Sequence, residues 1–175
     1  MVCMPALSPD GNNIPLTGIT EAQRPALAGV VLHDATVQTS LGGGHGEGET
    51  VDLQLRVVRS SNTGLLDFYY RFTPVANSAP AANAAALNVL FNLSGLELTY
   101  ADFRIDGLGT EPPNDFANGV GGAGSFYFTF LHSVPIGVST RFFFVSSNAA
   151  QFSPTAGRLL IGRTDTLAIP GPTAL

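Results

Sequence analysis

Lysine and tryptophan are absent from this chain of 175 residues, and cysteine occurs once, at Cys3. A single cysteine excludes a disulfide bond within the chain. The eight basic residues are therefore all arginines, thirteen acidic residues leave a net charge of −5, and charged residues make up only 12% of the chain. Because phosphate binding depends on clustered positive charge, this balance argues against a nucleic-acid partner.

Long apolar runs are also missing, since no stretch approaches the roughly 18 residues that a membrane-spanning helix needs. Apolar residues nevertheless account for 45% of the sequence, which excludes a disordered chain. No signal peptide opens the sequence, and we therefore expect either a cytoplasmic protein or a mature form that has lost its leader. The length predicts one domain with a single core. We expect residues 1–24 to be an N-terminal extension and residues 165–175 a C-terminal tail, because prolines near the end disfavour a strand.

Short alternating runs between glycines and prolines are the dominant pattern of the sequence. Residues 50–58 and 66–72 each place apolar side chains at every second position, and the polar segment 60–64 between them ends in Gly64. Such a pair predicts a β-hairpin with one buried face. Further strands are expected at the following positions: near 30–32, from about 86, at 96–100 and 103–105 (two strands or one bent strand), and at 126–130, 141–145 and 159–161. The sequence thus predicts an all-β fold, a single-domain antiparallel β-sandwich or jelly roll of about eight strands with a phenylalanine-rich core.

Three aromatic residues are candidates for a binding surface. Tyr69, Tyr127 and Phe143 occupy positions that alternate with the expected buried residues of their strands. If these strands share a sheet, the three rings form an exposed platform on which a sugar or a neighbouring subunit can pack. The alternative is that loops cover both faces of these strands.

A glycine-rich segment before residue 50 carries a candidate metal site. His45, Glu47 and Glu49 follow one another at two-residue spacing, so an extended backbone places one nitrogen ligand and two carboxylates on the same side. The alternative is a solvated loop, because ordering so many glycines costs conformational entropy.

Acidic side chains around the Gly/Pro-rich connection 107–115 suggest a second site. Asp102, Asp106 and Asp115 supply the oxygen ligands that calcium prefers. Their spacing does not follow a regular calcium loop, and aspartates are also common turn residues because they bond their own backbone.

A catalytic constellation is not evident. The adjacent pairs His33–Asp34 and His132–Ser133 point to opposite sides of a strand, and no G-x-S-x-G nucleophile elbow occurs. We therefore expect that the protein is not an enzyme.

Four segments occur in the order found in a known group of proteins. They are residues 24–29 (RPALAG), 55–60 (LRVVRS), 63–71 (TGLLDFYYR) and 140–149 (TRFFFVSSNA). Over about residues 24–163 the chain resembles uncharacterised bacterial exported all-β proteins of the kind often associated with PEP-CTERM sorting signals. The resemblance implies an all-β fold and export, but it implies no reaction, and Ile169-Pro-Gly-Pro172 is not a sorting motif.

Three functions follow from these patterns as hypotheses. The favoured one is a non-catalytic, extracellular or cell-surface protein with a structural, assembly or adhesive role, which self-associates through strand edges. The second is a carbohydrate-binding module that uses Tyr69, Tyr127 and Phe143, with calcium held near Asp102–Asp115. The third is a metal-dependent enzyme with its ion at His45, Glu47 and Glu49. The first requires no cofactor.

Overall fold

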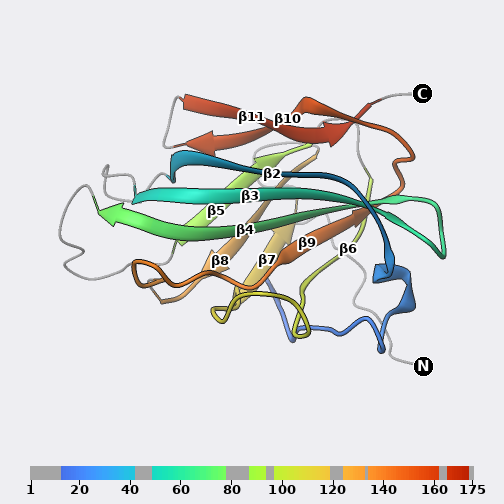
Figure 1. Ribbon diagram of the computed structural model, residues 1–175, viewed down its shortest axis with the longest axis horizontal. Helices are drawn as coiled ribbons and strands as arrows, with labels where there is room; N and C mark the ends of the chain where they lie inside the picture. The colour runs from blue at the N-terminus through green and yellow to red at the C-terminus, as the bar shows by residue number, and fades with distance from the viewer. Residues whose placement is uncertain are drawn as a thin grey trace.

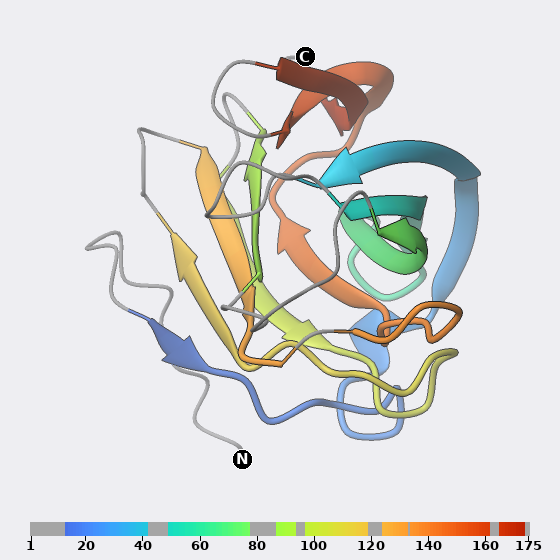
Figure 2. The ribbon, with the colours of Figure 1, turned by 90° about the vertical axis from the view of Figure 1, so that its left-hand side faces the viewer.

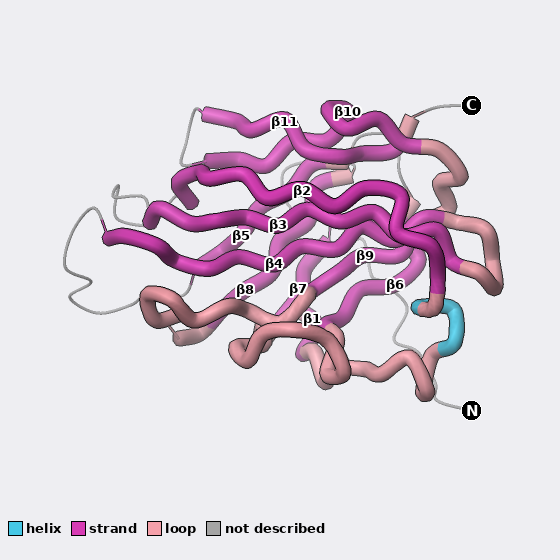
Figure 3. Tube along the Cα trace, viewed as in Figure 1, coloured by secondary structure: helices cyan, strands magenta, loops and turns pink. Residues whose placement is uncertain are grey.

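The computed structural model describes residues 13–41, 49–77, 87–93, 97–118, 124–132, 134–161 and 165–173. Within these ranges the chain forms eleven strands and one short 3-10 helix, η1 (Pro25–Leu27) (Figure 1, Figure 3). The strands are β1 (Ile14–Pro15), β2 (Gly29–Leu41), β3 (Glu49–Ser60), β4 (Leu66–Asn77), β5 (Leu87–Asn92), β6 (Leu98–Phe103), β7 (Asp115–Asn118), β8 (Ser125–Phe130), β9 (Phe143–Ser147), β10 (Phe152–Ile161) and β11 (Asp165–Pro172). The all-β prediction is confirmed, although the described residues already contain more strands than the eight expected.

The strands form two antiparallel sheets that face one another. One sheet has six strands in the order β1-β7-β8-β5-β10-β11, and the other has five in the order β2-β3-β4-β9-β6. Figure 2 shows the two sheets as separate layers. A large apolar cluster with members from both sheets lies between them, so the arrangement is sandwich-like.

The predicted hairpin is confirmed as β3 and β4. Its strands pair from Glu49 opposite Asn77 to Arg59 opposite Leu66, and the turn between them ends at Gly64, whose φ of 73° is a left-handed conformation that favours glycine. The alternate residues Val51, Leu53, Leu55 and Val57 all belong to the core. The period-two pattern therefore assigned the buried face of β3 correctly.

The ends of the chain depart from the predictions. Residues 165–172 form strand β11 beside β10 rather than a tail. Pro170 and Pro172 are compatible with this position because β11 is the last strand of its sheet, where one side of the backbone needs no ladder partner. Residues 14–24 are likewise part of the folded domain, as described below. Of the expected segments 96–100 and 103–105, the described residues 98–103 form the single strand β6.

The core is built largely from phenylalanine, and Phe143 of β9 lies at its centre. This fully buried ring packs against Phe128 and Phe130 of the opposite sheet, with centroid distances of 4.8 and 5.5 Å, and against Tyr70 of its own sheet at 5.9 Å. Edge-to-face and tilted contacts of this kind add to the stabilisation that comes from burial alone.

Replacing the central ring tests this core. Phe143→Ala is expected to lower the free energy of unfolding by about 3–5 kcal/mol, because it removes apolar contacts and leaves a cavity between the sheets. Urea denaturation followed by circular dichroism measures the change. Ile136→Ala, at an exposed apolar position, is the control and is expected to change stability by less than about 0.5 kcal/mol. Equal effects of the two substitutions would contradict the central role of Phe143.

Candidate functional site on the outer face of the five-stranded sheet

The N-terminal segment crosses the outer face of the five-stranded sheet. We call residues 16–28 the strap. Ile19 pairs beside the end of β6, where its N–H donates to the Phe103 carbonyl (2.9 Å) and its carbonyl accepts from the Ile105 N–H (3.0 Å). The strap then passes through η1 and enters β2 at the opposite edge of the same sheet. In Figure 1 this path is the blue segment that runs below the strands to the helical turn.

The strap covers a second apolar cluster, separate from the main core. Tyr69 of β4 stacks on Phe144 of β9 at a centroid distance of 4.9 Å and meets Phe142 edge-on at 6.2 Å. Leu27 of η1 belongs to the same cluster, whose remaining buried members are Val58 and Tyr100. Both faces of the sheet are therefore buried at this end, and the outward-facing aromatic residues are part of the interior.

The Asp102 side chain of β6 holds the strap to this strand by a hydrogen bond. Its buried carboxylate accepts three hydrogen bonds: from the Gly18 N–H (2.9 Å), from the Phe103 N–H (2.9 Å) and from the Tyr100 hydroxyl (2.8 Å). The Arg24 guanidinium lies over the Tyr100 ring at 3.9 Å. These contacts satisfy the buried carboxylate, as burial of an acidic group requires.

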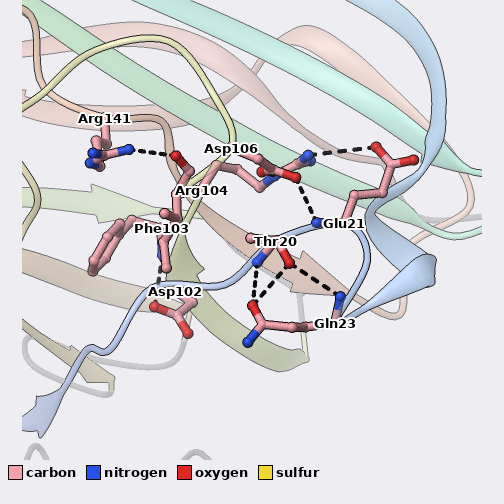
Figure 4. Close-up of polar contacts among 9 residues, drawn as sticks. Thr20, Glu21, Gln23, Asp102, Phe103, Arg104, Asp106 and Arg141 are labelled. Carbon is pink, nitrogen blue, oxygen red and sulfur yellow. Dashed lines mark hydrogen bonds and ion pairs between the residues drawn. The ribbon is translucent and has the colours of Figure 1, made fainter.

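Arg104 and two carboxylates hold the strap where it turns toward η1 (Figure 4). Arg104 Nε donates to Asp106 Oδ1 (2.7 Å), and Arg104 Nη2 lies 3.6 Å from Glu21 Oε2. The Glu21 N–H in turn donates to Asp106 Oδ2 (2.8 Å). The bond from Arg104 lowers the pKa of Asp106, while the bonds to Asp106 and the proximity of Tyr69 raise the pKa of Arg104 against the effect of its burial. The Asp106 carboxylate and the Arg104 guanidinium therefore both stay charged near neutral pH.

Asp67 is an acidic residue that is buried on this face, and neighbouring groups offset the cost of its burial only in part. It lies on β4 opposite Ser146 of β9 and is 6% exposed. Burial raises its pKa to about 6, although the Ser146 hydroxyl and the positive charges of Arg24 and Arg104 partly offset the shift.

A cleft of about 340 Å³ opens between the strap, β2, β3 and the loop that follows β6. Its volume is at the lower end of the range for small-molecule sites. The residues that line it are Glu21, Leu27, Gly29, Val31, Arg56, Val58, Tyr69, Arg104, Asp106, Gly107, Leu108 and Phe142.

Arg56 forms one wall of the cleft and is fixed in place by two contacts. Arg56 Nη2 donates to Asp34 Oδ2 (2.6 Å), and the guanidinium lies over the Phe142 ring at 4.7 Å. Arg71 approaches the same ring at 5.0 Å. Partial burial and the nearby charge of Arg56 lower the pKa of Arg71, whereas Asp34 opposes this change.

Tyr69 lies at the inner wall of the cleft, and its hydroxyl is buried. Burial, together with the charge of Asp67, raises the pKa of this phenol, and the side chain of Arg104 partly offsets the shift. The hydroxyl therefore keeps its proton throughout the physiological range.

The predicted aromatic platform is not assembled. Tyr69 does point away from the main core, but the strap covers it, which agrees with the alternative of covered faces. Phe143 faces the main core, and its neighbours Phe142 and Phe144 occupy the outward positions, so the expectation for β9 was wrong by one residue. Tyr127 lies on β8 in the other sheet, where its hydroxyl donates to Asn13 Oδ1 (2.7 Å).

The candidate metal ligands are likewise not brought together where they are described. Asp102 and Asp106 accept the hydrogen bonds given above, and Asp115 lies on β7 of the other sheet. Over the described ranges no three His, Cys, Asp or Glu side chains form a group suited to a metal ion. His45 and Glu47 fall outside the described residues, and of Glu49 only the backbone, at the start of β3, is described.

The sequence interpretation missed the cleft because its walls come from distant segments. Arg56 lies on the polar face of β3, at a position that alternates with the apolar residues of the run 50–58, and nothing in its own strand indicates a cover above it. The local signal in the sequence was the aromatic run 142–144. Because side chains alternate along a strand, these rings point to both faces of β9, and both faces then require burial.

Among the described residues, no helix has the length and apolar character required to cross a bilayer. Comparison of the chain with protein-family models, with curated proteins and with solved structures gives no match.

The raised pKa of Asp67 predicts a pH-dependent effect on stability. An unfolded aspartate ionises near pH 3.8 and folded Asp67 near 6, so folding opposes ionisation, and the penalty is absent below pH 3.8 and complete above 6. Asp67→Asn is therefore expected to raise the free energy of unfolding at pH 7 by about 1–3 kcal/mol. The gain should shrink as the pH falls from 6 and vanish below about pH 4.

Urea denaturation of wild type and variant between pH 4 and pH 8 measures this profile. Asp52→Asn is the control, since Asp52 on β3 has an exposed bond to Gln38. An Asp67→Asn protein that is less stable than wild type at pH 7 would show that the attraction to Arg24 and Arg104 exceeds the cost of burial.

Proposed function

We propose that this protein is a non-catalytic, exported or cell-surface β-sandwich module with a structural, assembly or adhesive role, and that it self-associates through the edge of β2. Export is supported by the low charge and by the resemblance to exported all-β proteins. The proposal requires only the two-layer arrangement; jelly-roll connectivity stays a prediction of the sequence.

Three of the four sheet edges carry features that oppose pairing with another chain. β1 has two residues, one of them Pro15, and β11 contains Pro170 and Pro172. The end of β6 is occupied by Ile19 of the strap. Short edge strands, prolines and covering segments are the usual protections of sheet edges.

The edge strand β2 differs from the other three, and this observation carries the proposal. It is 13 residues long, contains no proline, and has no hydrogen-bonded strand beyond it in its sheet among the described residues. β10 of the other sheet lies beside it, and there Phe152 meets His33 edge-on at a centroid distance of 6.0 Å. Its first half exposes three consecutive apolar side chains: Val30 (61%), Val31 (50%) and Leu32 (40%). The only irregularity in its ladder with β3 is a register shift between Val31 and His33. A long apolar edge is a template for an added strand.

Pairing of β2 with β2 of a second copy is the simplest assembly. An antiparallel pair around a two-fold axis joins the two five-stranded sheets into one continuous sheet and uses the same surface on both copies. The apolar side chains of residues 30–32 then lose solvent exposure, and the outward backbone groups of β2 gain partners.

A charge on this edge tests the proposal. Wild type is expected to show concentration-dependent dimers in sedimentation velocity, and Val30→Lys is expected to weaken association at least about tenfold, because an edge lysine must be desolvated on pairing. Ile136→Lys, at a similarly exposed apolar position away from any strand, is the control and should associate as wild type does. A wild type that remains monomeric at about 1 mM would contradict the proposal.

A further inference from the structure

The strap is attached more sparsely than the strands that it covers. Among residues 16–28 only Leu27 is buried, and Ile19 provides the ladder contact of the strap with the sheet. By contrast, β3 pairs with β2 on one side and with β4 on the other along its length. Segments with few buried contacts open at a lower free energy than core strands, so the strap can separate from the sheet while the sandwich stays folded.

A buried carboxylate lies beneath the strap. One row of directly opposed residues crosses the outer face of the sheet on β3, β4, β9 and β6: Val58, Asp67, Ser146 and Tyr100. The strap covers both ends of this row, because Leu27 packs in the same cluster as Val58 and the Arg24 guanidinium lies over the Tyr100 ring at 3.9 Å. Asp67, between these ends, is buried. Opening of the strap therefore brings the Asp67 carboxylate into contact with water.

The groups around Asp67 favour its ionised form only in part. The polar and ionisable side chains near it come from four segments: Arg24 of the strap, Tyr69 of β4, Ser146 of β9, and Tyr100 and Arg104 at the two ends of the 100–104 segment. The residue opposite on β3, Val58, is apolar. Burial raises the pKa of Asp67 to about 6, although Ser146 and the two arginines oppose the shift. Ionisation thus costs free energy as long as the strap keeps water away.

We propose that the strap is a pH-sensitive latch, which stays closed over the outer face while Asp67 carries a proton and opens more often once Asp67 is ionised. A solvated aspartate ionises near pH 3.8, so below this pH Asp67 is protonated in both forms and opening does not depend on its charge. Between pH 3.8 and 6 only the open form ionises readily, and above 6 the effect is complete. The two pKa values differ enough to change the opening equilibrium by about a hundredfold.

Opening of the latch changes the surface of the protein. The stacked rings of Tyr69 and Phe144, which the strap keeps buried, become accessible to solvent. The outer face is therefore closed in mild acid and more accessible near neutral pH. The latch makes no use of the outward edge of β2, so it is independent of the proposed self-association.

Hydrogen–deuterium exchange at pH 4.5 and pH 7.5, corrected for the intrinsic exchange rate at each pH, tests the proposal. The reporters are the Gly18 and Ile19 amides, which donate to Asp102 and to the Phe103 carbonyl, and the amides of β3 report global unfolding. In wild type the strap amides are expected to be less protected than those of β3 at both pH values, which identifies local opening. Their opening equilibrium is expected to rise at least about tenfold from pH 4.5 to pH 7.5.

Variants assign the effect to one carboxylate. Asp67→Asn keeps the shape of the side chain and removes its charge, so the protection of the strap should no longer differ between the two pH values. Asp52→Asn is the matched control and should keep the wild-type pH dependence, because Asp52 lies on β3 in an exposed bond to Gln38. Val30→Lys should also keep it, which separates the latch from self-association.

Three outcomes would overturn the latch, and the first two need no variant. One is a wild-type strap that exchanges only together with β3. Another is a strap whose opening does not increase between pH 4.5 and pH 7.5. The third is an Asp67→Asn protein whose strap keeps the wild-type pH dependence.

Discussion

The structure depends on a sheet whose two faces must both be kept from water. In β9 and the residue before it, Phe142, Phe143 and Phe144 follow one another, and because side chains alternate along a strand they cannot share a face. Phe143 enters the space between the sheets, while Phe142 and Phe144 need a second cover on the outside. The six-stranded sheet supplies the first cover, and the strap supplies the second.

Covering the outer face with backbone rather than with a third sheet has electrostatic consequences. A strap has N–H groups that need acceptors, and the carboxylates of Asp102 and Asp106 provide them at Gly18 and Glu21. Positive charge lies near both carboxylates: Arg24 lies over the ring of Tyr100, whose hydroxyl donates to the buried Asp102, and Arg104 donates to the exposed Asp106. Burial on the same face raises the pKa of Asp67 to about 6 and also raises the pKa of the Tyr69 hydroxyl. The cleft lies beside these polar groups, at the margin of the strap.

The strap also leads into β2, the edge strand on the other side of the sheet. It starts beside β6, so that edge is partly occupied, and it ends by becoming β2 at the other side of the sheet. One continuous segment therefore closes one edge and creates the other. The proposed assembly edge and the cleft are adjacent, since Val31 belongs to β2 and to the cleft lining.

Local alternation in the sequence determined the all-β class, the β3–β4 hairpin and the buried face of β3, because each depends on neighbouring residues and on a period of two. It did not determine the orientation of β9. Aromatic residues occupy both odd and even positions there, so the two faces of the strand are equally apolar and alternation does not show which one points to the core. Nor did it determine the burial of Tyr69, the role of residues 16–28 or the strand at 165–172, since each depends on a partner far away in the chain. Only the tertiary structure decided which outer face received a cover, and with it where the cleft lies, because the strap and the strands that it covers are far apart in the chain.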